Sequence, residues 1–279
     1  VIPTLNGGEE LQACLTAIYA QQCSRPFEVL CIDSSSRPEQ VAAMRQFPIH
    51  LVTVARQDFN HGLTRDQGAA QTQGTVIVFL NQDAVPAHPH WLEQLTAPLF
   101  TTDPPAAVQG AMAEVTDPTQ WFFWHSCGER FYFTSESRDW IAAHGGIGFS
   151  TVNAALRRNV WQQHPFGHAP IMEDKKWQQA VTATGHCIAY APEALVYHTH
   201  NYHWHSLKRR CISEGYGWRL LGVTYGLGRC WQDMRQAPYR EWWRGVRCGE
   251  IRTAAAFCFP WARPWWLYWG NRWARSVRL

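Results

Sequence analysis

The sequence predicts an α/β fold with a doubly wound, mostly parallel sheet and a helical C-terminal extension. Apolar runs of strand length alternate with segments whose apolar residues recur at helical spacing, as in βαβ units. The run 27–32 is followed directly by Asp33. The run 75–80 is followed by Asn81 and Gln82 and then by Asp83. Because parallel strands end at one edge of a sheet, we expect both carboxylates at the edge where such sheets bind ligands.

The N-terminal half supplies the first βαβ units. Val1-Ile2-Pro3 has the pattern of the end of a strand, which suggests that the sequence is a fragment, and a Gly-rich turn follows. Apolar residues at helical spacing then predict a helix that leads to the strand ending at Asp33. Further elements are expected in the order strand 50–54, helix 66–74, strand 75–83, helix 91–100 and strand 106–113.

The middle of the chain departs from this alternation. Residues 117–150 contain the aromatic clusters 121–124 and 131–133 and end in a Gly-rich return, so we expect a long excursion that holds substrate. An apolar stripe from Lys175 to Thr184 predicts a helix that begins with Glu173-Asp174. Short strands are expected at 187–190 and 195–198.

Charge divides the chain into two expected domains, 1–205 and 206–279. Residues 201–279 hold 14 Lys+Arg and 4 Asp+Glu, so the other 200 residues hold the remaining 11 and 18. The same tail contains 10 of the 16 Trp. This composition favours helices that lie on an anionic membrane surface. Nucleic acid is the rival binding partner. Alternatively, the helices pack on the α/β core or on a partner subunit and bury their tryptophans. No stretch reaches the roughly 20 apolar residues of a spanning helix, and nine cysteines without C-x-x-C spacing indicate a reducing compartment.

Three groups of residues are candidates for chemistry. Glu173 and Asp174 either cap a helix or supply a general base for an acceptor hydroxyl. His198 and His200 are expected on one face of a strand. They either bind a metal ion together with a carboxylate or form a cluster of surface histidines. Arg65 is expected at the start of a helix beside the strands that end at Asp33 and near Asp83. There it either binds an anion or forms an ion pair with Asp58 or Asp66.

Missing motifs narrow the function classes. The chain has no G-x-G-x-x-G, no G-x-x-x-x-G-K-[ST] and no G-x-S-x-G, which argues against dinucleotide oxidoreductases, P-loop kinases and serine hydrolases. A glycosyltransferase, a sugar-nucleotide nucleotidyltransferase and a noncatalytic carbohydrate or nucleic-acid binding module remain. The acidic loop 4–10 disfavours the second class, and the binding module leaves the acidic residues without a role.

The ordered motifs resemble the family 2 inverting glycosyltransferases of GT-A fold, most closely their bacterial rhamnosyltransferase branch. They are V-I-P-T-L-N-G-G at 1–8, V-L-C-I-D-S-S-S at 29–36, F-N-H-G-L-T-R at 59–65, F-L-N-Q-D-A at 79–84, Glu173-Asp174 and H-T-H at 198–200. The resemblance covers roughly residues 1–205. Two departures from the family pattern are Gln82-Asp83 in place of a D-x-D pair and Asp66 in place of a common Asn.

The resemblance implies a role for each site residue. The nucleoside would be held by Pro3, Thr4, Asn6 and Asp33, with Arg65 and Gln82 near the nucleotide. Asp83 would bind Mg²⁺ or Mn²⁺ and the diphosphate, with His198 as a further metal ligand. Asp174 would be the catalytic base, and the acceptor or loop candidates are Glu173, Trp177 and His200.

The implied partners are those of surface polysaccharide synthesis in bacteria. The donor would be a nucleoside-diphosphate sugar, with deoxythymidine-diphosphate (dTDP) rhamnose suggested by the resemblance alone. The acceptor would be a glycan or a lipid-linked glycan, presented where residues 206–279 rest on the membrane. We therefore expect a cytoplasmic protein, peripheral on the inner face of the cell membrane, with no nucleic-acid partner.

Overall fold

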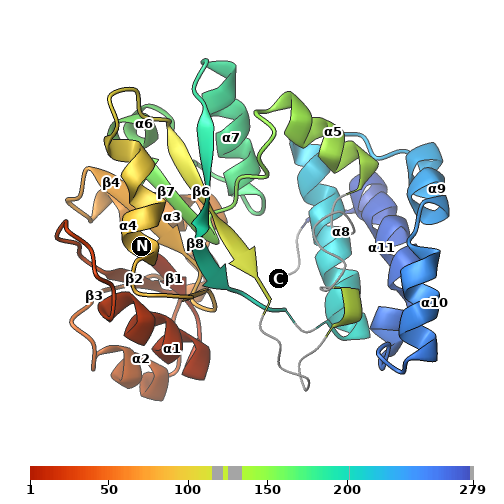
Figure 1. Cartoon of the computed structure of the whole chain (residues 1–279), viewed down its shortest axis with the longest axis horizontal. Coiled ribbons are helices and arrows are strands. Elements are labelled where there is room, and N and C mark those ends of the chain that lie inside the picture. The colour runs from red at the N-terminus through yellow and green to blue at the C-terminus, as the bar shows by residue number, and fades with distance from the viewer. Residues whose placement is uncertain (115–121, 125–133, 201, 277–279) are drawn as a thin grey trace. The chain divides into compact units, whose positions relative to one another are not determined.

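The computed structural model describes residues 1–114, 122–124, 134–200 and 202–276. The chain forms two compact units, Val1–Val115 with His144–Thr199, and Thr116–Ala143 with His200–Leu279 (Figure 1). Of the predicted excursion, Trp121 and Phe131–Phe133 lie outside the described residues. Each unit is described below by itself.

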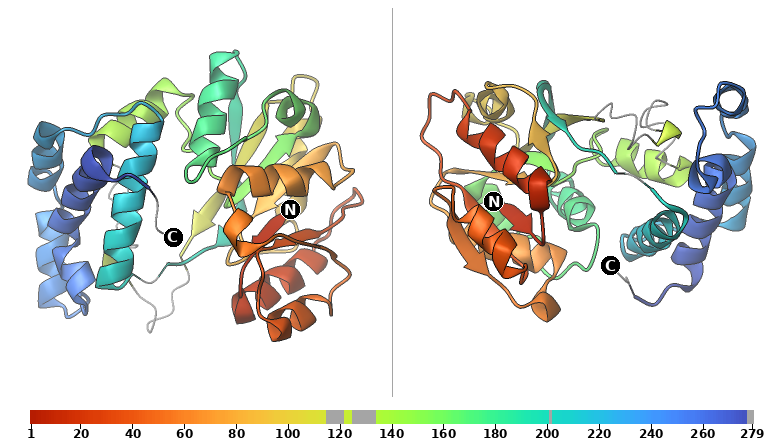
Figure 2. Two further views of the ribbon diagram at one scale, coloured as in Figure 1. Left: turned by 180° about the vertical axis from the view of Figure 1, so that it is seen from behind. Right: turned by 90° about the horizontal axis from the view of Figure 1, so that it is seen from below.

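The first unit alternates strands and helices, and Figure 2 shows it from two further directions. Its strands are β1 (Ile2–Thr4), β2 (Leu30–Asp33), β3 (His50–Thr53), β4 (Val76–Leu80), β5 (Val85–Pro86), β6 (Ala107–Ala113), β7 (Asn153–Arg157) and β8 (Ile188–Tyr197). Its α-helices are α1 (Gly8–Tyr19), α2 (Pro38–Met44), α3 (His61–Ala70), α4 (Trp91–Thr96), α6 (Arg158–Gln163) and α7 (Glu173–Ala183), with 3₁₀ turns η1 (Arg56–Asp58) and η2 (Ala97–Phe100).

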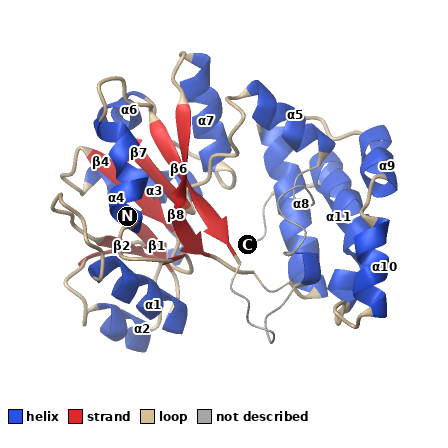
Figure 3. Cartoon of the chain, in the orientation of Figure 1, coloured by secondary structure: helices blue, strands red, loops and turns tan. Residues whose placement is uncertain are grey.

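Two sheets join side by side in this unit (Figure 3). The first is parallel, in the order β1-β2-β3, and the second has the order β4-β7-β6-β8-β5. At the junction the Val1 amino group donates to the Val78 carbonyl at 2.7 Å, and Leu80 N–H donates to the Val1 carbonyl at 3.3 Å. The carboxyl ends of β1, β2 and β4 therefore meet at one edge.

Helices cover both faces of the sheet, as the predicted doubly wound class requires. Along β4, Ile77 and Phe79 pack into the core beneath α3, α6 and α7, whereas Val76, Val78 and Leu80 pack into the core beneath α1 and α4. Strand residues two apart share a face, so alternate β4 side chains fill two different cores. The predicted α/β class is confirmed.

Strand pairing differs from the prediction in one respect. Strand β7, which the sequence pattern did not reveal, pairs antiparallel with both β4 and β6, and β5 pairs antiparallel with β8. The second sheet is therefore mixed, with β6 and β8 as its parallel pair. The pattern missed β7 because five residues that include two alanines carry little strand signal.

Three predicted boundaries also need correction. Helix α3 begins at His61 and not at Asp66, because the Asn60 side chain accepts from Leu63 N–H and caps the earlier turn. The helix predicted over 91–100 changes to a 3₁₀ turn at Ala97, where Pro98 follows. The two short strands predicted at 187–190 and 195–198 are one strand, β8, whose register with β6 shifts between Gly110 and Ala111.

The second unit contains the helices α5 (Ser135–Ala143), α8 (Trp204–Leu220), α9 (Leu227–Arg235), α10 (Tyr239–Arg247) and α11 (Ala254–Trp273). Helices α8 and α11 approach closely, since a Cβ on Gly215 would lie 2.1 Å from the Leu267 carbonyl oxygen. Buried aromatic residues fill the core, and the Trp124 indole donates to the Ala256 carbonyl at 2.6 Å. Among the residues that the structure describes, no helix has the length and apolar character needed to cross a bilayer.

Asn153 holds the irregular part of the second sheet together. Its amide donates to the carbonyls of Ala111 and Ala194 and accepts from the Trp91 indole, all at 3.1 Å or less. Asn153→Ala should lower the free energy of unfolding by about 2–4 kcal/mol, because three buried polar groups lose their partner. Urea titration against Gln162→Ala, a change on the exposed side of α6, checks this. Equal stability of the two variants would contradict it.

Candidate functional site

Hydrogen bonds at the ends of β1 and β2 organise the loops expected to hold a nucleoside. The buried Asp33 carboxylate accepts from Thr4 Oγ1 at 3.0 Å, and from the backbone and hydroxyl of Ser36 at 2.9 and 2.5 Å. Asn6 has a left-handed φ of +49°, and its side chain accepts from Arg37 N–H at 2.9 Å. The predicted set of Pro3, Thr4, Asn6 and Asp33 thus lies at one edge.

Gln82 ties the turn after β4 to the same edge. Its Oε1 accepts from Leu5 N–H at 2.8 Å, and its Nε2 donates to the Leu5 carbonyl at 3.2 Å. A side-chain amide that pairs in this way imitates the next strand of a sheet. Gln82 therefore positions the turn that carries Asp83, and its expected contact with the nucleotide stays a prediction.

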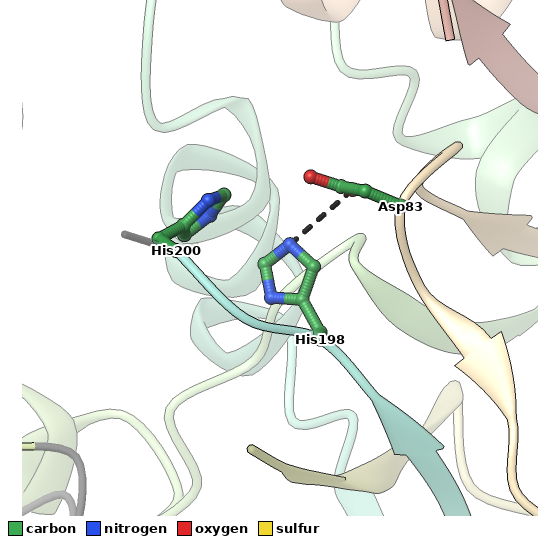
Figure 4. Close-up of side chains that lie close together, drawn as sticks. All are labelled: Asp83, His198 and His200. Carbon is green, nitrogen blue, oxygen red and sulfur yellow. Dashed lines mark ion pairs between the residues drawn. The ribbon is translucent and has the colours of Figure 1, made fainter. Parts of the chain in front are cut away.

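Asp83, His198 and His200 form a candidate metal centre (Figure 4). His198 Nε2 lies 3.3 Å from Asp83 Oδ1, and each of the three residues offers a ligand atom within 4.8 Å of the others. Asp83 follows β4, and His198 follows β8, where its N–H donates to the Ala113 carbonyl at 2.9 Å. The first unit ends at Thr199, so Asp83 and His198 belong to that unit and His200 lies just beyond it.

The donor set suits a divalent cation. One carboxylate oxygen and imidazole nitrogens are ligands that Mn²⁺ accepts, whereas Mg²⁺ prefers oxygen alone. The sequence prediction that Asp83 and His198 approach each other is therefore matched by the geometry. His200, predicted as an acceptor or loop residue, lies where a third ligand would be.

Arg65 and Glu173 form a buried ion pair between α3 and α7. Arg65 Nη1 lies 3.2 Å from Glu173 Oε1, which also accepts from Thr151 Oγ1 at 2.9 Å. The other arm of the guanidinium, Nη2, donates to Asn81 Oδ1 at 3.2 Å. Burial opposes ionisation of Glu173, but the charges of Arg65 and His61 and the hydrogen bonds to the carboxylate together outweigh it, so the pKa of Glu173 lies below its ordinary value. Arg65 thus pairs with Glu173 and not with Asp58 or Asp66.

Asp174 stands at the start of α7, as the sequence predicts. The helix follows Met172, whose φ of +56° turns the chain into it. Asp174 Oδ1 accepts from Lys175 N–H at 2.7 Å, its Oδ2 lies 3.8 Å from Lys175 Nζ, and its side chain is 16% exposed. Lys175 Nζ in turn donates to the Phe149 carbonyl. The carboxylate is therefore oriented by its neighbours and still reaches solvent.

Two residues have structural roles that the sequence did not show. Trp177 was expected among the acceptor candidates, but it is 1% exposed and its indole donates to the His164 carbonyl, so it is a core residue. The Asp66 carboxylate accepts from the Trp161 indole at 2.7 Å and from the backbone N–H groups of Phe166 and Gly167. A carboxylate at this position therefore anchors the loop before α7.

The sequence reasoning missed Ser36, Asn81 and Thr151. Ser36 follows Asp33 by three residues, a spacing at which an Asp side chain can cap a backbone N–H, so a local signal existed. Asn81 belongs to the motif at 79–84, which predicts no separate role for it. Thr151 carried no signal, because its contact with Glu173 depends on how β7 and α7 pack.

Solved structures share this fold. One is a mannosyltransferase from Pyrobaculum calidifontis in complex with GDP-Man and Mn²⁺, with a TM-score of 0.63 and 16% identity over 99% of this chain and 86% of that one. Another is glucosyl-3-phosphoglycerate synthase from Mycobacterium tuberculosis in complex with Mn²⁺, UDP-glucose and phosphoglyceric acid, with a TM-score of 0.60 and 18% identity over 80% of this chain and 78% of that one. The fold is that of the GT-A glycosyltransferases.

Sequence similarity defines the family. Residues 1–164 match the glycosyl transferase family 2 profile, and the chain belongs to this family. The O-antigen chain rhamnosyltransferase RfbN of Salmonella typhimurium is 33% identical over 72% of this chain, and WbaN of Salmonella anatum is 28% identical over 72% of it. The matched region spans 66% of the length of each of these two relatives.

The depressed pKa of Glu173 makes its contribution to stability depend on pH. Ionised Glu173 stabilises the fold above the ordinary carboxyl pKa of 4.5, and this contribution is lost as the pH falls through the lower folded value. Glu173→Gln should therefore be less stable than wild type at pH 7, with a difference that shrinks below about pH 4. Urea titrations at several pH values measure it. A difference that grows on acidification would show that the pKa is raised.

Proposed function

We propose that this protein transfers a sugar from a nucleoside-diphosphate sugar, with inversion at the anomeric carbon. The donor in this proposal is dTDP-L-rhamnose, and the acceptor is a glycan or lipid-linked glycan of a bacterial surface polysaccharide. One observation carries the proposal: Arg65 contacts both the turn that bears Asp83 and the helix start that bears Asp174. Family membership and the rhamnosyltransferase relatives support the donor class.

Inversion sets a geometric demand on the two carboxylates. The base must lie behind the acceptor oxygen while the diphosphate leaves from the opposite side of the anomeric carbon, so the two groups must come from different loops. Asp83 after β4 and Asp174 at the start of α7 satisfy that demand. In this proposal Asp174 takes the proton of the acceptor hydroxyl, and the loops at Thr4, Asn6 and Asp33 receive the nucleoside.

A divalent cation belongs to the proposal. Asp83 and His198 would hold it, with His200 as a third ligand, and the bound cation would stabilise charge on the departing diphosphate. Single aspartate ligation in place of a D-x-D pair favours a cation that accepts imidazole, which is why we propose Mn²⁺ before Mg²⁺.

The two rival function classes have less support. A sugar-nucleotide nucleotidyltransferase needs a basic, Gly-rich phosphate loop after the first strand, but residues 4–10 contain two glutamates and no basic residue. A noncatalytic binding module would not require the turn of Asp83 and the start of α7 to be joined through a buried charge.

Loss of the base tests the catalytic proposal directly. With water as the sugar acceptor, Asp174→Asn should lower the rate of dTDP release from dTDP-L-rhamnose by about 10²- to 10⁴-fold, because general-base catalysis contributes that much. Calorimetry should find dTDP binding unchanged. Asp103→Asn, on the exposed loop before β6, is the matched control and should keep full activity. Full turnover by Asp174→Asn would refute the assigned role.

Metal binding is tested separately. His198→Ala should weaken Mn²⁺ binding by about tenfold or more, because one ligand of the proposed set is lost. The loss of free Mn²⁺ signal in electron paramagnetic resonance measures binding without any sugar donor. His164→Ala, a change far along the sequence from the three ligands, serves as control. Equal Mn²⁺ affinity in wild type and His198→Ala would remove His198 from the site.

The second unit supports a membrane-surface proposal on one specific face. Exposed aliphatic, aromatic and basic residues recur every four positions along α9 and α10, which puts them on one side of each helix. They are Leu227, Trp231, Arg235, Tyr239, Trp243 and Arg247. Trp231 and Trp243 are 60% and 55% exposed, and the Tyr239 hydroxyl donates to the Met234 carbonyl and joins the two helices. Such a face suits anionic phospholipid on the inner leaflet of the cell membrane.

The membrane proposal has its own test. Trp231→Ser/Trp243→Ser should weaken flotation with phosphatidylglycerol vesicles by about tenfold or more, because two large apolar side chains no longer leave water. Trp265→Ser/Trp269→Ser changes two tryptophans that are 43% and 47% exposed on α11, and should bind like wild type. Equal losses in both variants, or no binding by wild type, would overturn the assignment to α9 and α10.

A further inference from the structure

Arg65 has a buried position that does not suit direct contact with a donor. The residue is 5% exposed, and its two terminal nitrogens contact groups of the protein on three sides: the His61 carbonyl, Asn81 Oδ1 and Glu173 Oε1. A guanidinium presents its donors in a rigid planar fork, so these contacts orient it strongly. The contacts differ from the nucleotide role that the sequence resemblance implied.

The partners of Arg65 lie in the two segments that matter for the reaction. Asn81 opens the turn that contains Asp83, and the Asn81 carbonyl accepts from Ala84 N–H at 3.1 Å to close that turn. Glu173 is the first residue of α7, directly before Asp174. Thr151 holds the same Glu173 oxygen at 2.9 Å, so the carboxylate cannot turn away without losing two partners.

We propose that Arg65 is a positioning residue that sets the placement of the Asp83 turn relative to Asp174. This inference rests on the proposed function, because it concerns how Asp83, on the side of the leaving group, and Asp174, the base, keep their relative positions. Misplacement by about 1 Å is enough to cost about 10²-fold in rate, so a rigid link between the two loops has a large effect on turnover. The link need not contact donor or acceptor.

If only the Arg65 charge were removed, an effect on the placement of the loops could not be separated from an effect on folding stability. A single Arg65→Met leaves the Glu173 carboxylate buried without its partner, which destabilises proteins strongly. The variant Arg65→Met/Glu173→Leu removes both charges and should therefore regain most of the melting temperature that Arg65→Met loses. Positioning and stability then become separable, because the contact with Asn81 is absent in both variants.

The experiment compares these variants with wild type in three measurements. Donor free of dTDP, dTDP-L-rhamnose with Mn²⁺ and with water as the sugar acceptor, reports the rate of dTDP release. Calorimetry gives the Kd for dTDP, and hydrogen exchange follows the amides of 81–85 and 173–177. Arg158→Met is the control, since Arg158 bonds to Ala69, Thr72 and Gly74 at the other end of α3. The control should lose stability and keep its rate of release.

We expect Arg65→Met/Glu173→Leu to release dTDP about 10- to 100-fold more slowly, with a Kd for dTDP within about twofold of wild type. Exchange should rise in both segments. Release of dTDP at the wild-type rate in a folded double variant would overturn the proposal, and so would hydrogen exchange that rises in neither segment. A tenfold higher Kd for dTDP would also overturn it, because Arg65 would then contact the donor nucleotide. If wild type releases no dTDP, the proposed donor fails, while the exchange measurement still decides the link.

Discussion

The buried ion pair of Arg65 and Glu173 is the contact on which the arrangement of the candidate site depends. It lies between α3 and α7, and the same guanidinium reaches Asn81 in the turn after β4. Removing two charges from water costs free energy that their attraction offsets only when hydrogen bonds complete the geometry, and Thr151 and the His61 carbonyl supply these bonds. The pair therefore contributes mainly to the placement of loops and less to net stability.

Hydrogen bonds of polar side chains also hold the other loops at this edge of the sheet. Polar side chains here bond to backbone or to each other: Asp33 to Thr4 and Ser36, Gln82 to Leu5, and Asp66 to the backbone at 166 and 167. Except for the local bond between Asp33 and Ser36, each bond joins segments that are distant in sequence. Asp83 and Asp174, to which the proposed function assigns chemistry, are both partly open to solvent.

The second unit divides its tryptophans between core and surface. Trp124, Trp140 and Trp218 are buried, and Trp242 packs against Phe257 and Trp261. These tryptophans pack within the second unit, whereas Trp231 and Trp243 are exposed on α9 and α10. Packing of the tail helices on the first unit or on another subunit stays a prediction. Composition alone gave a basic, Trp-rich tail and could not separate the two groups, because the burial of each Trp depends on how the helices of this unit pack.

The sequence by itself determined the α/β class, the strands that end at Asp33 and near Asp83, the helix that begins at Glu173, and the family. These features rest on local patterns: apolar periodicity, turn residues and motifs read in order. Only the tertiary structure revealed β7 and the contacts of Arg65 with Asn81 and Glu173. The physical reason is that a short alanine-containing strand and a long-range ion pair gain their stability from partners far along the chain, so no local pattern records them.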